Sequence, residues 1–163
     1  MKTLLILRHA KSDWDEPGVA DHDRTLSGRG KRDAPRAGQH LRTAQMVPDL
    51  ILCSSAKRAR RTAKMVAEAS GYEGEVALKD ELYLAGAETY IEVLQKVPDA
   101  CKSVMVVGHN PGLEELLVAL TGEAEHLPTA ALARVALPIA HWRDISEEVD
   151  GKLVDIWRPK EGE

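Results

Sequence analysis

The chain has 163 residues, of which 44% are hydrophobic and 29% charged, and its formal net charge is -4. This length predicts one domain over residues 1–163 with a sizeable core. The acidic balance provides no overall positive field to attract nucleic acid or an anionic membrane, so we expect neither as a partner. Apolar runs are far below the roughly 18 residues of a membrane span, and the first residues lead into a strand instead of a signal peptide, which predicts a cytoplasmic protein.

Short aliphatic runs alternate with helical stretches along most of the chain. Strands are expected over 3–7, 50–53, 76–79, 104–107, 132–137 and 152–157. Because strands that alternate with helices build parallel sheets, the pattern predicts an α/β fold, a three-layer α/β/α sandwich around a mostly parallel sheet. The run 76–79 is expected at an edge, and the last two runs are expected as a hairpin-like extension of the sheet.

Helix signals fall between these runs. Ser27 is an N-cap residue for a first helix that Pro35 should bend or restart. Ser54 and Ser55 are expected to cap a second helix, which Gly71 ends. In chain order, the helices are expected after Ser27 and over 56–70, 88–97 and 113–121.

Polar side chains follow three of the predicted strands. Arg8 and His9 close the first, Ser54 follows the second, and His109 lies just beyond the run 104–107. The carboxyl ends of parallel strands meet at one edge of a sheet, so we expect these side chains to converge. An imidazole can attack phosphorus and a guanidinium can bind two phosphate oxygens at once, which points to phosphoryl chemistry. The alternative is that Arg8-His9 is an ordinary polar strand end.

Further positive charge is expected at the same edge. Arg58 lies in the first turn of the second helix, and helix N-termini near Ser55 and Pro111 face the predicted crevice. The rest of the basic run 57–64 is expected on the surface. No metal site is predicted, because neither the cysteines nor the remaining histidines have metal-ligand spacing. These residues are Cys53, Cys101, His22, His40, His126 and His141.

Four segments carry more specific motifs: LRHAKS at 7–12, TLSGRG at 25–30, SSAKRARRTA at 54–63 and VGHNPGL at 107–113. In this order and spacing they resemble the histidine phosphatase superfamily and, within it, the small SixA-type phosphohistidine phosphatases. The resemblance covers nearly the whole chain and implies a phosphoglycerate mutase-like fold. Larger members carry an inserted lid subdomain, for which this chain leaves no room. Ala10 stands where the superfamily more often has glycine.

The resemblance also implies site roles. It makes His9 the nucleophile that forms a phosphohistidine intermediate. It places Arg8, Arg58 and His109 around the phosphoryl group that is transferred. Arg24 matches a position that reaches the phosphate pocket in SixA-like proteins.

Glu81 is the first choice for a general acid, because many members use a glutamate on the segment after the third strand. An imidazole leaving group, with a pKa near 6.5, needs far less help from an acid than an alkoxide does. We therefore expect a phosphatase without metal or other cofactor that acts on protein phosphohistidine.

Two other functions stay open at this point. The chain could be a phosphatase of small phosphomonoesters, or a non-catalytic phosphate-binding module with the same fold. The expected partner is accordingly a phosphohistidine-bearing protein or a small phosphorylated substrate. The sequence leaves the oligomeric state open, a monomer included.

Overall fold

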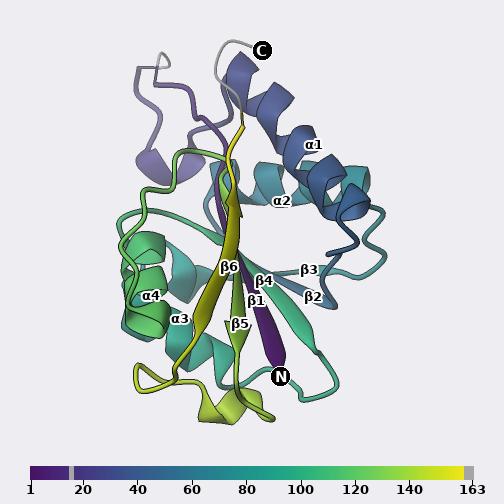
Figure 1. Ribbon diagram of the computed structural model, residues 1–163. Coiled ribbons are helices and arrows are strands. Elements are labelled where there is room, and N and C mark those ends of the chain that lie inside the picture. The colour runs from purple at the N-terminus through teal and green to yellow at the C-terminus, as the bar shows by residue number, and fades with distance from the viewer. Residues whose placement is uncertain (15–16, 160–163) are drawn as a thin grey trace.

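A six-stranded sheet forms the centre of the computed structural model, which describes residues 1–14 and 17–159 (Figure 1). The strands are β1 Lys2–Arg8, β2 Leu50–Ser54, β3 Val76–Lys79, β4 Ser103–Gly108, β5 Leu132–Leu137 and β6 Lys152–Trp157. Their order is β3-β2-β4-β1-β5-β6. The first four in this order are parallel, whereas β5 is antiparallel to both β1 and β6. The predicted α/β fold with a mostly parallel sheet is confirmed, and β3 lies at an edge as expected.

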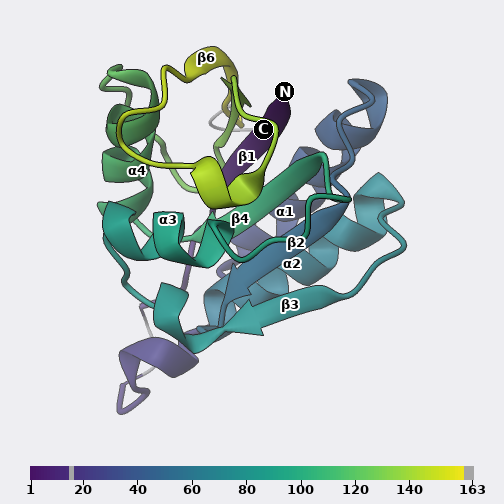
Figure 2. The same ribbon diagram turned by 90° about the horizontal axis from the view of Figure 1, so that it is seen from below.

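Helices cover both faces of the sheet. The α-helices are α1 Gly28–Thr43, α2 Lys57–Ser70, α3 Ala87–Leu94 and α4 Gly112–Thr121. Short 3-10 helices are η1 Asp21–Asp23, η2 Asp80–Leu82 and η3 Trp142–Asp144. Helices α1 and α2 lie on one face, and α3 and α4 lie on the other (Figures 1 and 2). This arrangement is the predicted three-layer sandwich.

Strand β1 shows why the sheet is buried on both sides. Leu4 and Ile6 pack with α3 and α4, whereas Leu5 and Leu7 pack with α1 and α2, and all four are fully buried. A strand covered on both faces has no solvent side, so its sequence reads as a continuous apolar run. Burial of this run stabilises the centre of the sheet. It also places Arg8 and His9, which follow the run, at the edge of the sheet.

The structure decides two local predictions about helices. Of the two effects predicted for Pro35, a restart does not occur, because α1 runs from Gly28 to Thr43 as one helix with Pro35 inside it. The serine cap predicted for α2 is wrong, since Ala56 is the N-cap and Ser54 Oγ accepts a hydrogen bond from the Ala56 amide at 3.2 Å. Strand β2 runs on through Ser54, which leaves that side chain available at the sheet edge. Gly71 ends α2 in the left-handed region at φ 79°, as predicted.

The stretch between η2 and β4 contains α3 as its one α-helix and no inserted subdomain, and it is described throughout. Helix α3 ends at Leu94, earlier than expected. This stretch therefore adds no lid subdomain over the edge of the sheet at β1 and β4. None of the helices among residues 1–14 and 17–159 combines the length and the apolar character that crossing a membrane requires.

Candidate active site

The polar residues at the ends of β1, β2 and β4 lie together in space. The ring centroids of His9 and His109 are 5.2 Å apart, and His109 Nε2 lies 2.8 Å from Ser54 Oγ. A pocket of about 250 Å³ opens here. Its lining residues are Arg8, His9, Lys11, Ser12, Trp14, Asp21, Arg24, Arg58, Leu84, His109, Asn110 and Thr129. The predicted convergence of strand ends is confirmed.

His9 is held as a neutral imidazole with one nitrogen free to react. Its Nδ1 lies 2.7 Å from the carbonyl oxygen of Ala10. A carbonyl oxygen can only accept, so Nδ1 carries the hydrogen and Nε2 carries a lone pair. Burial, helped by the charges of three nearby arginines, lowers the pKa of His9 to about 4. The ring is therefore unprotonated at neutral pH, which is the state that a nucleophile needs.

The backbone around His9 is fixed by contacts from α1 and α2. The Ala10 amide donates to Thr62 Oγ1 at 2.9 Å, and Thr62 Oγ1 in turn donates to the Arg58 carbonyl at 2.7 Å. A Cβ on Gly30 would lie 2.2 Å from the Lys11 carbonyl oxygen, so only glycine permits this approach. Ala10 itself is fully buried. The motifs at 7–12, 25–30 and 54–63 thus meet around one loop.

His109 is buried next to His9 and is also neutral. Burial, followed by the neighbouring His9, lowers the pKa of His109 to about 3. Its Nε2 is engaged by Ser54, while its buried Nδ1 has no hydrogen-bond partner among the described residues. Tyr90 Oη accepts from the His109 amide at 3.3 Å and so fixes the backbone at this position.

Three guanidinium groups surround the histidines. Arg8 and Arg58 are anchored to backbone carbonyls, with Arg8 Nη1 3.1 Å from Leu127 O and Arg58 Nη1 2.7 Å from Asp21 O. Three buried nitrogens, Nε of Arg8, Nη1 of Arg24 and Nε of Arg58, lack a hydrogen-bond acceptor among the described residues. Unpaired buried donors are costly. An oxyanion in the pocket would satisfy several of them at once.

Asp21 and Tyr83 are site residues that sequence reasoning missed. Asp21 pairs with Arg58 at 3.1 Å and with Arg24 at 3.2 Å, and it accepts a hydrogen bond from Tyr83 Oη. That hydrogen bond, aided by the arginines, lowers the pKa of Asp21. The Tyr83 ring lies edge-on to His109 with centroids 5.6 Å apart. Asp21 therefore orients two of the arginines that line the pocket.

The structure does not bring Glu81 to this pocket. It lies exposed on η2 and is not among the residues that line the pocket. Its neighbour Tyr83 contacts the site instead. Arg24, in contrast, is buried and lines the pocket together with Arg58, in agreement with the position that the family resemblance implies.

Known proteins share this fold and sequence pattern. The model of the histidine phosphatase superfamily (branch 1) matches residues 4–83. An uncharacterized protein of Mycobacterium tuberculosis is 36% identical over 152 residues, which cover 85% of this chain and 91% of the relative. The crystal structure of a candidate phosphohistidine phosphatase SixA from Agrobacterium tumefaciens superposes with a TM-score of 0.83 at 32% identity, covering 97% of this chain and 98% of that one. A SixA candidate from Nakamurella multipartitia gives a TM-score of 0.84 at 28% identity, with 97% and 96% covered.

The fold, the pocket and these matches together define a class: the chain belongs to the histidine phosphatase superfamily. Its nearly complete overlap with the SixA structures, and the sheet edge without a lid subdomain, make it a histidine phosphatase of the SixA type.

The depressed pKa of His9 predicts a pH dependence of stability. In the unfolded chain the His9 imidazole binds a proton with its ordinary pKa of 6.5. In the folded protein it binds a proton only near pH 4. The unfolded state therefore binds more protons in this window, and the free energy of unfolding falls as the pH is lowered from 6.5 to 4, by up to about 3 kcal/mol through His9 alone. Urea unfolding across this range measures the slope. His9→Asn should reduce the slope and leave the contribution of His109, whose pKa is lowered to about 3. An unchanged slope would refute the assignment.

Proposed function

We propose that the protein is a phosphatase that transfers a phosphoryl group to His9 Nε2 and then hydrolyses the phosphohistidine so formed. The observation that carries the proposal is a neutral His9, with Nε2 left free, among buried guanidinium donors. Arg8, Arg58 and Arg24 would bind the phosphate oxygens. His109 lines the same pocket, and its buried Nδ1, which has no hydrogen-bond partner among the described residues, would be a further contact. Cationic donors of this kind stabilise the charge of the transition state without any change in their own positions.

The reaction takes two steps. In the first, the Nε2 lone pair forms a bond to phosphorus as the bond to the leaving group breaks with its electron pair. In the second, water attacks the same phosphorus, inorganic phosphate leaves, and the electron pair returns to Nε2. The three arginines and Lys11 face one carboxylate, Asp21, in the pocket lining. This excess of positive charge supports a mechanism without a metal ion.

The substrate we propose is protein phosphohistidine. Its imidazole leaving group departs with little acid assistance, which suits a pocket that Glu81 does not reach. Trp14 and Leu84 line the pocket mouth with 70% and 58% of their surfaces exposed. Leu84 has a φ of 52°, a left-handed conformation that bulky residues rarely adopt. An apolar, uncovered mouth favours a protein-borne phosphoryl group over a small polar ester.

We also propose that the enzyme works in the cytoplasm.

A comparison of substrates tests this assignment. We expect kcat/KM for a phosphohistidine-bearing protein to exceed that for sugar, nucleotide and aryl phosphates by about 10²-fold, with no loss after dialysis against a chelator. His9→Ala provides the background, since phosphohistidine also hydrolyses spontaneously. Preference for one small phosphate ester would overturn the substrate assignment, and loss of activity in chelator would overturn metal independence.

A further inference from the structure

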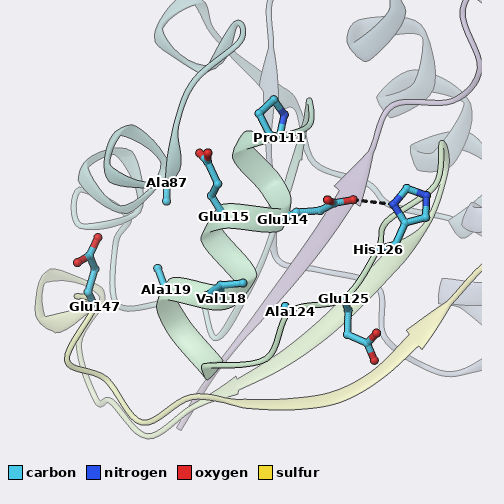
Figure 3. A pocket seen from close by; sticks show the side chains of 10 residues that line it. All are labelled: Ala87, Pro111, Glu114, Glu115, Val118, Ala119, Ala124, Glu125, His126 and Glu147. Carbon is cyan, nitrogen blue, oxygen red and sulfur yellow. Dashed lines mark hydrogen bonds and ion pairs between the residues drawn. The ribbon is translucent and has the colours of Figure 1, made fainter.

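A second and larger cavity, of about 740 Å³, is shown in Figure 3. It adjoins the pocket lined by His9 and the arginines, which is called the phosphate pocket below. Its floor is the outer face of α4, where Val118 and Ala119 lie opposite the helix's buried leucines. Ala87 at the start of α3 and Ala124 after α4 complete the apolar part. Val118 is 43% exposed, although valine is normally buried. We refer to this cavity as the α4 groove.

Carboxylates surround the apolar floor of the α4 groove. Figure 3 shows the side chains of Glu115 and Glu147 beside the floor, on the flank that Ala87 occupies. Both are exposed, and neither forms an ion pair with another of the described residues. Glu125 also lines the groove and lies 3.9 Å from Arg158. Glu114, the fourth carboxylate of the lining, pairs with His126 at 3.0 Å. The α4 groove thus combines an apolar floor with two carboxylates, Glu115 and Glu147, that have no ionic partner among the described residues.

The α4 groove and the phosphate pocket share a wall. Asn110 lines the phosphate pocket, and the next residue, Pro111, lines the groove. Glu114 Oε2 accepts hydrogen bonds from Asn110 Nδ2 and the Leu127 amide, each at 2.8 Å. The Leu127 carbonyl in turn accepts from Arg8 Nη1. The wall is therefore rigidly connected to a phosphate-binding arginine, and the two neighbouring sites have opposite charge.

We propose that the α4 groove binds a segment of the phosphoprotein substrate in which lysine or arginine residues flank an apolar side chain. The inference rests on the proposed function and names a further requirement for its substrate. The apolar side chain would contact Val118 and Ala119, and the flanking cations would pair with Glu115 and Glu147. Because the phosphoryl group is drawn to the arginines and the basic segment to the carboxylates, the two charges orient the substrate across the shared wall. An anionic ligand would be repelled by the same carboxylates.

The first test measures binding without catalysis. An unphosphorylated peptide with a Lys-Leu-Lys-Lys-Leu core should bind the protein, as measured by calorimetry. Its affinity should fall as the salt concentration is raised. The double variant Glu115→Lys/Glu147→Lys should weaken binding about tenfold or more. Glu73→Lys, an exposed carboxylate outside the groove lining, is the matched control and should bind as the parent does. Equal binding by parent and double variant would overturn the proposal.

The second test measures catalysis with phosphohistidine peptides that carry either the basic core or a glutamate-flanked core. We expect the double variant to lose about tenfold in kcat/KM on the basic peptide only, while aryl phosphate turnover stays within about twofold. If the parent hydrolyses both peptides equally, the groove assignment fails and the proposed function stands. If the parent hydrolyses neither but binds the basic core through Glu115 and Glu147, the phosphohistidine assignment fails and the groove remains a peptide site.

Discussion

Replacing His9 with alanine is expected to lower kcat for an aryl phosphate by about 10⁴-fold or more, because removal of a nucleophile abolishes the covalent route. The substitution removes a side chain that is only 7% exposed but leaves the loop's backbone contacts through Thr62 in place. Binding of an oxyanion such as tungstate should therefore persist within about tenfold, since the arginines remain. Steady-state kinetics and equilibrium titration separate the two effects.

His40→Ala is the matched control for this loss. His40 lies on α1 and stacks on Trp157 with ring centroids 5.3 Å apart, outside the residues that line the pocket. Its removal should leave kcat unchanged within about twofold. If His9→Ala turns over aryl phosphate as fast as His40→Ala and the parent, His9 is not the nucleophile. If the parent itself does not turn it over, the chain is better described as a phosphate-binding module.

Arg58→Ala is expected to reduce kcat/KM by about 10²- to 10³-fold, the typical cost of one transition-state donor. Arg58 is 2% exposed, so solvent does not replace it. Its loss also releases Asp21, which then no longer bridges two cations. Arg58→Lys should restore part of the activity, because a lysine supplies the charge without the planar pair of N–H donors. Steady-state kinetics on an aryl phosphate measure both variants.

Arg61 provides the comparison on the same helix. It lies one turn after Arg58 but is exposed, and it does not line the pocket. Arg61→Ala should change kcat/KM by less than about threefold, through weaker long-range attraction of the substrate alone. Similar kinetics for the two alanine variants would remove Arg58 from the site and leave the basic run as a surface feature.

The convergence of Arg8, His9 and His109 was predictable because it depends on topology. Apolar runs without alternation indicate strands buried on both faces, and parallel strands bring their ends to one edge. Segments 90 or more residues apart in sequence are then expected to be neighbours, and this prediction requires no information on side-chain contacts. The antiparallel placement of β5 beside β1 does not disturb this edge, since the polar ends belong to the parallel strands.

Sequence reasoning could not predict how three side chains lie relative to the site. These are Asp21, Tyr83 and Glu81. Asp21 lies on η1, and its role depends on an ion pair with a residue 37 positions away. Glu81 lies in the 3-10 turn η2, and Tyr83 follows it directly. Although the two residues are only two positions apart, Glu81 is exposed, whereas Tyr83 contacts His109. No periodic pattern of apolar residues extends through these short segments. The spacing of Asp21 three residues before Arg24 was the one available signal.

Regiospecific trapping of the intermediate tests the central claim most directly. The hydrogen bond from Nδ1 to the Ala10 carbonyl leaves only Nε2 of His9 to attack. Rapid quenching during turnover of a phosphorylated substrate, followed by mass spectrometry and phosphorus NMR, should find acid-labile phosphate on Nε2 of His9. Phosphate on His109, on Nδ1 of His9, or on no residue during steady turnover would contradict the account.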